Sequence, residues 1–422
     1  MTKASGPDID QYAARAREWL AANLPRRAAP TDGWGSGSDS VALLHSLSAA
    51  EERALIDDAR AWHRRKADAG YGSIDWSVED GGAGLGREYA RAFAREEAQF
   101  ATPPTHESIA ITLELVGPTI RAWGDDRQRE RYLRPLRRTD EMWCQLFSEP
   151  GAGSDLARLS TRAVRDGNEW VIHGQKVWTS GAQYAEFGYI ICRTDPAVPK
   201  HRGLTAFIVP MRTSGVEARP LRQMTGGASF NEVFFDGARV GDDMRLGGVG
   251  DGWRVAMTTL GFERAAGAGG ERPGGWSRVR ALAEHLGVTG DTVVRQRLAA
   301  LYTTLTVLRL TNQRVAAGVR AGQTPGPEGS IGKLAGTEAM RETTRVVSAL
   351  LGPRLVADTR EWGTFAWSEY VNGAPGYRIA AGSDEVQRNI IGERVLGLPA
   401  EPRVDRDVSF GELIGEFGRR PG

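Results

Sequence analysis

The spacing of the hydrophobic residues changes twice along this 422-residue chain, and that change constrains the fold more than any other feature. From Asp8 to about Arg138, apolar residues recur at steps of three and four, as they do on amphipathic helices. From Met142 to about Val240, short β-branched and aromatic runs are separated by turn-forming residues, which is typical of an antiparallel sheet. Helical spacing returns from Gly252 to about Pro399. The chain is therefore predicted to be a mostly helical α+β protein.

These zones predict three domains and the place where a ligand binds. We expect a helical N-terminal domain over residues 1–138, a middle β-domain over 139–245 and a C-terminal helical bundle over 246–422. The last residues, from Pro399 on, are expected to form a tail that docks on a neighbouring subunit. Helices are expected over 8–25, 46–67, 87–100, 124–136, 293–315, 330–351 and 385–395. Clefts between domains are favoured ligand sites, so we expect the site where the three domains meet.

The composition excludes several classes of protein. The 54 Lys and Arg against 53 Asp and Glu leave a net charge of +1, whereas a nucleic-acid binder needs a basic excess to displace counterions from phosphates. No stretch approaches the ~20 apolar residues of a membrane helix, and the N-terminus lacks the apolar core of a signal peptide. We therefore expect neither a nucleic-acid partner nor a membrane segment.

The two cysteines and six histidines argue against a disulfide or metal scaffold. Cys144 and Cys192 each lie within an apolar run, which excludes a disulfide framework and favours the thiol-keeping cytoplasm. The histidines show none of the HxxxH, CxxC or HxxEH spacings that are typical of transition-metal sites. We therefore expect a cytoplasmic protein with no metal site built from its own side chains.

The glycine-rich segment LFSEPGAGSDL, residues 146–156, is the strongest local signal. An apolar strand runs directly into Glu149, Pro150 and a turn in which two glycines allow backbone amides to converge into an anion-binding nest. Such a loop can hold a pyrophosphate or the polar edge of a flavin ring, and a simple hairpin turn is the alternative. Glu149 is expected to accept structural hydrogen bonds from backbone amides, and Asp155 to cap the turn that follows.

A second segment, GQKVWTSGAQYA at residues 174–185, places an indole and hydroxyl groups at the end of a strand. Trp178, Thr179 and Ser180 together can cover the face and edge of an isoalloxazine ring. The alternative is a tryptophan of the hydrophobic core followed by a polar turn. Taken alone, this segment favours the alternative.

In this order and at this spacing, the two segments resemble the acyl-CoA dehydrogenase family. The resemblance extends through residues 224–240, 250–270 and 382–399. It implies an all-helical N-terminal domain, a middle β-barrel and a C-terminal four-helix bundle. It also implies FAD between the β-domain and the bundle, and a homotetramer or dimer in which a second subunit covers part of the cofactor. A heteromer with a related subunit is a further possibility, and an electron-transfer flavoprotein is the implied electron acceptor.

The resemblance also carries the ligand contacts over to individual positions of this sequence. The implied FAD contacts are Gln145, Leu146, Ser148, Gly153, Ser154, Trp178, Thr179, Ser180, Ser383 and Glu385. The implied contacts to an acyl-CoA substrate are Ser154, Arg264 and Ala381. Glu385 stands where the family usually has glutamine.

Two positions in the family can carry the glutamate that removes the α-proton of the substrate. At the more usual position, before a Gly-Thr pair near the C-terminus, this chain has Ala381, which cannot act as a base. Isovaleryl-CoA dehydrogenase and similar enzymes carry the base in an L-x-x-E-R setting, which Leu260, Glu263 and Arg264 match here. The neighbours of Glu263 are mostly apolar, so burial is expected to raise its pKa toward a useful range. The alternative is a solvated Glu–Arg pair on the helix surface.

The activity that this resemblance implies is FAD-dependent α,β-dehydrogenation of an acyl-CoA, with Glu263 as the catalytic residue. An acyl-CoA oxidase or flavin monooxygenase on the same scaffold is one alternative. A non-catalytic subunit of a heteromeric dehydrogenase is another, and it is motivated by Ala381. The small residues Ala380 and Ala381 favour a branched, long or ring-bearing acyl group over a short straight one.

Overall fold

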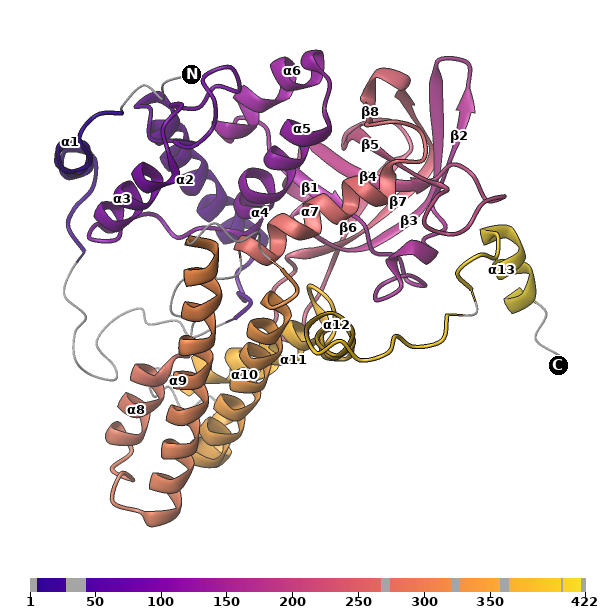
Figure 1. The fold of residues 1–422 in the computed structure, drawn as a ribbon. Coiled ribbons are helices and arrows are strands. Elements are labelled where there is room, and N and C mark those ends of the chain that lie inside the picture. Colours follow the sequence, from indigo (N-terminus) through magenta and orange to yellow (C-terminus); the bar gives the residue numbers. More distant parts are fainter. Residues whose placement is uncertain are drawn as a thin grey trace.

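The computed structural model describes residues 6–27, 43–266, 274–320, 326–356, 364–403 and 405–418. An N-terminal helical region, a β-sheet and a C-terminal set of helices follow one another along the chain (Figure 1). This order confirms the predicted mostly helical α+β fold. No helix within the described residues is long and apolar enough to cross a membrane.

The N-terminal region begins with helices whose first turns are fixed by side-chain caps. The Asp8 side chain accepts from the backbone of residues 10 and 11, and Ser48 forms a capping box with Glu51. Helices α1, α2 and α3 surround a core that includes Leu20 and Trp62. The helices of this region are α1 (Ile9–Asn23), α2 (Ala49–Asp68), α3 (Arg87–Glu97), α4 (Glu107–Ala110), the π-helical η1 (Ile111–Val116), α5 (Gly117–Trp123) and α6 (Asp126–Arg137).

The middle region is one eight-stranded sheet in the order β6-β7-β3-β2-β4-β5-β8, with β1 pairing with β4. The strands are β1 (Trp143–Leu146), β2 (Arg162–Asp166), β3 (Glu169–Ser180), β4 (Phe187–Arg193), β5 (Leu204–Pro210), β6 (Val216–Leu221), β7 (Phe230–Gly241) and β8 (Arg245–Leu246). The expectation of a closed antiparallel barrel is wrong. Strands β1 and β2 pair with β4 in parallel, and within the described residues no pairing joins the edge strands β6 and β8. Closure would need paired edges, and β8 has only two residues with which to pair.

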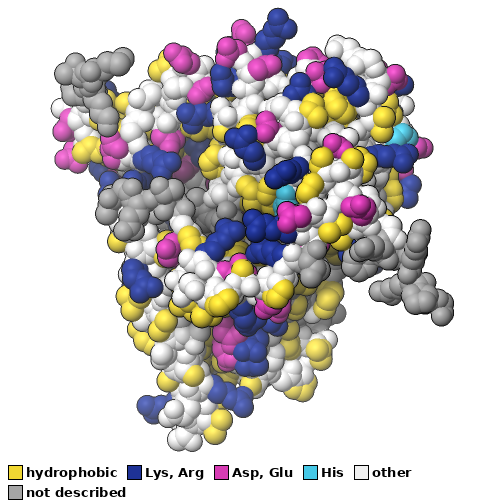
Figure 2. Space-filling view, turned by 45° about the vertical axis from the view of Figure 1, so that its right-hand side comes forward, with side chains coloured by type: hydrophobic (Ala, Val, Ile, Leu, Met, Phe, Trp, Pro, Cys, Tyr) yellow, Lys and Arg dark blue, Asp and Glu magenta, His cyan; other side chains and the backbone are white. Residues whose placement is uncertain are grey.

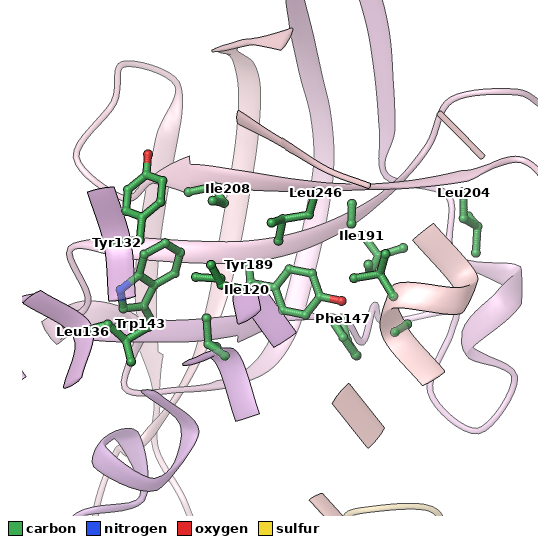
Figure 3. Close-up of a cluster of buried hydrophobic side chains, with 14 of the residues drawn as sticks. Ile120, Tyr132, Leu136, Trp143, Phe147, Tyr189, Ile191, Leu204, Ile208 and Leu246 are labelled. Carbon is green, nitrogen blue, oxygen red and sulfur yellow. The ribbon is translucent and has the colours of Figure 1, made fainter. Parts of the chain in front are cut away.

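One face of this sheet packs against helices from both neighbouring regions. Ile120 of α5, Leu136 of α6 and Val255 of α7 (Gly252–Ala266) are fully buried against Trp143 and Tyr189 of the sheet. Figure 3 shows Leu136 and Trp143 close together and Tyr189 near Ile120 and Phe147. This cluster joins all three regions, so it fixes α7 against the sheet.

The C-terminal region is a helical bundle in which α8 to α11 share one core. Trp367, Leu301 and Val347 are among its most buried members. The helices are α8 (Trp276–His285), α9 (Thr292–Arg320), α10 (Gly329–Leu351), α11 (Thr364–Ile379), α12 (Asp384–Ile390) and α13 (Phe410–Gly418). Helix α12 continues as a π-helical turn, η6 (Ile391–Val395), within the range predicted as a single helix.

The C-terminal tail packs on the sheet of its own chain, and the expectation that it also docks on a neighbouring subunit stays a prediction. The guanidinium of Arg193 lies 3.8 Å from the ring centroid of Phe410 at the start of α13. The backbone N–H of Phe410 donates to the carbonyl of Val198 over 3.0 Å, and that of Gly411 donates to the carbonyl of Pro196 over 2.8 Å. Figure 1 shows α13 beside the sheet, away from the bundle.

Candidate active site

The glycine-rich segment after β1 is a tight hairpin turn. The backbone groups of Glu149 and Ala152 exchange two hydrogen bonds of 3.0 Å. Neither Gly151 nor Gly153 has a left-handed backbone, so the alternating handedness of the predicted anion-binding nest is absent. A Cβ atom added at either glycine would meet nothing within 4 Å. The outer edge of the turn therefore has room for a ligand.

A buried ion pair holds this turn against β3. The Glu149 carboxylate accepts from the backbone amides of Ser160 (2.7 Å) and Thr161 (2.9 Å), which confirms its predicted structural role. Lys176 is fully buried and donates to the Glu149 carboxylate (2.9 Å) and to the carbonyl of Phe147 (3.0 Å). Burial works against ionisation, but Lys176 and these hydrogen bonds hold the pKa of Glu149 below its usual value.

The Asp155 side chain does not cap the turn that follows it, so that expectation is wrong. The turn from Leu156 to Arg158 has no side-chain cap. The Asp155 carboxylate instead accepts from the ammonium of Lys200 over 2.7 Å. A charged partner within reach outcompetes a turn amide, because hydrogen bonds between ionised groups are stronger.

The end of β3 exposes an indole beside an unpartnered hydroxyl. Trp178 is 64% exposed and has a φ of 59°, at an irregularity in the pairing of β3 with β7 between Lys176 and Thr179. Its exposure excludes the alternative of a core tryptophan. Thr179 is 1% exposed, and its hydroxyl has no hydrogen-bond partner among the residues that the structure describes. A ligand bound beside Trp178 could satisfy this hydroxyl.

The turn and the end of β3 lie side by side. The backbone N–H of Val177 donates to the carbonyl of Ser148 over 2.9 Å, which places Ser148 next to Trp178. Gln145, Ser148 and Ser180 are partly buried, whereas Gly153 and Ser154 are exposed. Leu146 is fully buried in the sheet core, so only its backbone can contact a cofactor. Eight of the predicted FAD contacts thus come from two adjacent segments.

The remaining predicted contacts lie at the junction of α11 and α12. Ala381 has a φ of 55°, and its carbonyl accepts from the Gln387 side chain over 3.1 Å. Ser383 caps α12 by accepting from the amide of Val386 (3.4 Å), and its hydroxyl can still donate to a ligand. The Glu385 side chain is 75% exposed and lies 3.6 Å from Arg388. This junction is therefore a fixed turn with an exposed carboxylate beyond it.

Helix α7 carries Glu263 in its last turn. One turn earlier, Thr259 is fully buried and shares hydrogen bonds with the hydroxyls of Thr119 (2.8 Å) and Tyr189 (3.3 Å). Residues four apart lie on one helix face, so Glu263 extends this face beyond the sheet. Glu263 is partly buried. Its exposure therefore lies between that of the solvated Glu–Arg pair and that of the fully buried carboxylate considered in the sequence analysis. The side chain of Arg264 lies outside the described residues.

A buried cluster behind the end of β3 was missed by the sequence analysis. The Glu52 carboxylate accepts from Tyr184 (2.9 Å) and lies 3.0 Å from His106 and 3.1 Å from His45. The backbone N–H of Gly181, just after β3, donates to the carbonyl of Ser229, whose hydroxyl contacts His45. These residues come from distant segments, so no spacing in the sequence could reveal them.

The same cluster bears on the predicted absence of a metal site. The ligand atoms of His45, Glu52 and His106 lie within 4.8 Å of one another, close enough to hold a cation. Glu52 already accepts hydrogen bonds from this set, and those bonds account for the proximity without a cation. Burial works against ionisation here too, but the bonds from His106, His45 and Tyr184 lower the pKa of Glu52 to about 2.

We expect Glu52→Gln to destabilise the protein in a pH-dependent way. A carboxyl with a lowered pKa in the folded state contributes stability above its ordinary pKa near 4.5 and loses it as the pH falls toward about 2. The variant should lose about 3 kcal/mol of unfolding free energy at pH 7. That deficit should shrink between pH 4.5 and pH 2. Denaturant titrations of both proteins at several pH values measure it, and a deficit that stays constant with pH would contradict the assignment.

An open sheet between helices, with an exposed indole beside a buried hydroxyl, is an arrangement that can hold a flat ring such as a flavin. Profiles of the acyl-CoA dehydrogenase N-terminal, middle and C-terminal domains match residues 43–140, 144–238 and 250–396. The chain belongs to the acyl-CoA dehydrogenase family. It is an oxidoreductase that acts on acyl-CoA, and its cofactor is FAD, which the exposed Trp178 and the unpartnered Thr179 fit.

Relatives in sequence and in structure support this assignment. The acyl-CoA dehydrogenase IpdE1 of Mycobacterium tuberculosis is 37% identical over 94% of this chain and 99% of its own length. Human mitochondrial short-chain specific acyl-CoA dehydrogenase is 34% identical over 46% of this chain and 47% of its own length. The solved steroid acyl-CoA dehydrogenase Tcur3481-Tcur3483 is similar with a TM-score of 0.73 and 27% identity, over 95% of this chain and 100% of the matched one.

Proposed function

We propose that this chain converts an acyl-CoA thioester to the trans-2-enoyl-CoA, with Glu263 removing the α-proton. Bound FAD supplies the acceptor for the hydride that leaves the β-carbon. The observation that carries the proposal is the placement of Glu263, partly buried and one turn beyond the hydrogen-bonded Thr259 on a helix packed against the sheet. The other position at which the family can carry the base is Ala381 here, which has no carboxylate.

The other site residues would bind and orient the reactants. The backbone N–H of Ala381 is proposed to polarise the thioester carbonyl, which makes the α-proton more acidic. Arg264 and Ser154 are proposed to contact the CoA part of the substrate. The proposed FAD contacts are Gln145, the backbone of Leu146, Ser148, Gly153, Ser154, Trp178, Thr179, Ser180, Ser383 and Glu385. Holding both reactants in a fixed geometry supplies a large part of the rate enhancement.

A ring-bearing acyl group is the proposed substrate class. The turn at Ala380 and Ala381 carries only methyl side chains, which leaves room beside the thioester. The solved relative Tcur3481-Tcur3483, at 27% identity, is a steroid acyl-CoA dehydrogenase, which agrees with a bulky ring substrate. We propose an electron-transfer flavoprotein as the electron acceptor, on the family resemblance.

An assembly of two different subunits is the second candidate. One solved relative is the ChsE4–ChsE5 complex of Mycobacterium tuberculosis, at 26% identity and a TM-score of 0.69. A heteromer would also agree with the loss of the usual base at Ala381. Purifying the chain with and without co-expressed relatives tests this. Yellow protein from the chain alone supports a homomer, and colour gained only with a second polypeptide supports a heteromer.

The activity itself is tested by product mass. Holoenzyme is incubated with branched, ring-bearing and straight acyl-CoA thioesters and an artificial electron acceptor. The proposal predicts a product lighter by two hydrogens, which adds water when an enoyl-CoA hydratase is supplied. Transfer of oxygen into the product would support a monooxygenase instead, and unchanged substrate across the panel would contradict the proposal.

We expect Trp178→Ala to weaken FAD binding without weakening the fold. The side chain is 64% exposed, so its truncation should change the unfolding free energy of the apoprotein by less than about 0.5 kcal/mol. Loss of an aromatic contact to a ring is expected to raise the dissociation constant of FAD about tenfold. Flavin fluorescence during titration of the apoprotein measures this. Val164→Ala, at another exposed strand residue, is the control, and equal FAD affinity in all three proteins would contradict the contact.

A further inference from the structure

The C-terminal tail and the β4–β5 connection are fastened together beside the glycine-rich turn. The ammonium of Lys200 donates to the carboxylates of Asp405 (2.6 Å) and Asp155 (2.7 Å). The pKa of Lys200 is raised by these two carboxylates against the opposing effect of burial. Arg193 donates to the carbonyls of Lys200 and Ala157, both over 2.6 Å. Tail, connection and turn therefore form one rigid junction.

A cavity of about 460 Å³ lies in this junction, between the tail and the β4–β5 connection. Arg202 and His201 line it from the connection, and Arg406 lines it from the tail. Pro199 and Asp407 complete the lining. Two guanidinium groups against one carboxylate make the cavity positive. Arginine is suited to phosphate, because its planar fork donates two parallel hydrogen bonds.

The cavity lies beside the proposed substrate site. Ser154, a proposed contact to CoA, directly precedes Asp155, the partner of Lys200. His201 packs edge-on against Trp253 at the start of α7, with ring centroids 4.7 Å apart. Ten residues of α7 separate Trp253 from Glu263, which is about 15 Å along a helix. In the view of Figure 2, Lys and Arg side chains and a histidine lie together near the middle of the face shown, with Asp and Glu side chains among them.

This separation matches the dimensions of a CoA thioester. Its pantetheine arm is an amide chain of roughly four residue lengths, which spans about 14 Å when extended. A thioester held near Glu263 would thus place the phosphates of CoA near the level of Trp253 and His201. Phosphate is the anion that the cavity side chains recognise best, and Asp407 offers an acceptor for a ribose hydroxyl.

We propose that this cavity binds the phosphate-bearing nucleotide end of the CoA substrate, and that the tail supplies Arg406 to it. The inference rests on the proposed function, because it takes acyl-CoA as the ligand and Glu263 as the site of reaction. It assigns the tail a role in substrate recognition. Asp405, held by Lys200, positions Arg406 at the cavity rim.

Arg406→Ala in the full-length holoenzyme tests this, with two substrates that carry the same acyl group. One is the acyl-CoA and the other is the acyl-pantetheine, which lacks the nucleotide and its phosphates. Loss of one charged hydrogen bond should raise KM for the acyl-CoA about 10- to 100-fold, with kcat unchanged. KM for the acyl-pantetheine should stay the same. Arg202→Ala should behave alike, and Arg403→Ala, an exposed arginine paired with Glu393, is the control.

The possible outcomes separate the two proposals. Equal KM values for the acyl-CoA in the parent and the Arg406 variant would overturn the inference, as would equal losses with both substrates. Failure of the parent protein to oxidise either thioester would instead contradict the proposed function. Thermal unfolding and FAD content of each variant establish that the comparison is made between folded holoenzymes. Calorimetry with CoA gives the same comparison without turnover, and unchanged affinity in both arginine variants would also overturn the inference.

Discussion

Glu263→Gln should retain FAD and fold normally but reduce its flavin with acyl-CoA about 100- to 10,000-fold more slowly than the parent. A general base contributes about 10²- to 10⁴-fold to such a step, and glutamine preserves the shape of the side chain without accepting the proton. The carboxylate is only partly buried, so its replacement should leave the helix and the hydrogen bonds of Thr259 in place. Stopped-flow absorbance under anaerobic conditions measures the rate.

Glu385→Gln is the matched control, because Glu385 is an exposed carboxylate on α12 and a proposed FAD contact rather than a base. It should change the reduction rate by less than about tenfold. If Glu263→Gln reduces its flavin at the parental rate, residue 263 is not the base. If both variants lose activity to the same extent, the loss reflects a general disturbance of the active site. It then does not identify Glu263 as the proton acceptor.

Lys176→Met should destabilise the protein by about 3–5 kcal/mol and impair FAD binding. The change leaves the Glu149 carboxylate buried without its ammonium partner, and an uncompensated buried charge costs that much. Lys176 also holds the carbonyl of Phe147, so its loss should loosen the turn from Glu149 to Ala152. Thermal unfolding measures the first effect, and the flavin content of the purified protein measures the second.

Two further variants separate the ion pair from other effects of the substitution. The double variant Lys176→Met with Glu149→Gln removes both charges and should recover part of the lost stability. Arg219→Met breaks an exposed pair with Glu217 and should leave stability almost unchanged, because solvent screens exposed pairs. A loss in Lys176→Met as small as that in Arg219→Met would contradict the structural role of the buried pair.

The order of the structural regions was predictable because periodicity reports local structure directly. The steps of three and four before Arg138 became helices, and the β-branched and aromatic runs after Met142 became a sheet, as predicted. The openness of the sheet was not predictable, since such runs show neither the direction in which strands pair nor whether the edge strands meet. Pairing of β1 and β2 with β4 in parallel is decided by contacts between distant segments. The π-helical turns η1 and η6 were likewise not predictable, because the spacing of hydrophobic residues did not reveal them.

The candidate site was predictable where its residues are contiguous. The segments 146–156 and 174–185 meet at the hydrogen bond between Val177 and Ser148, and their motifs are visible in the sequence. The His45–Glu52–His106 cluster and the cavity at Arg202 and Arg406 were not predictable. Each brings together segments that lie more than 50 positions apart in the sequence. Taken singly, each of these side chains cannot be distinguished from an ordinary polar residue. Asp155 was misassigned for the same reason, because its partner Lys200 is remote in sequence.

The central claim, that Glu263 faces the α-carbon of a bound acyl-CoA, is tested most directly by a crystal structure of the FAD-loaded protein with a non-reactive acyl-CoA analogue. The account predicts a Glu263 carboxylate oxygen about 3–3.5 Å from the α-carbon, on the side of the acyl chain opposite the flavin. A carboxylate turned toward bulk water, or a different carboxylate at that carbon, would contradict it.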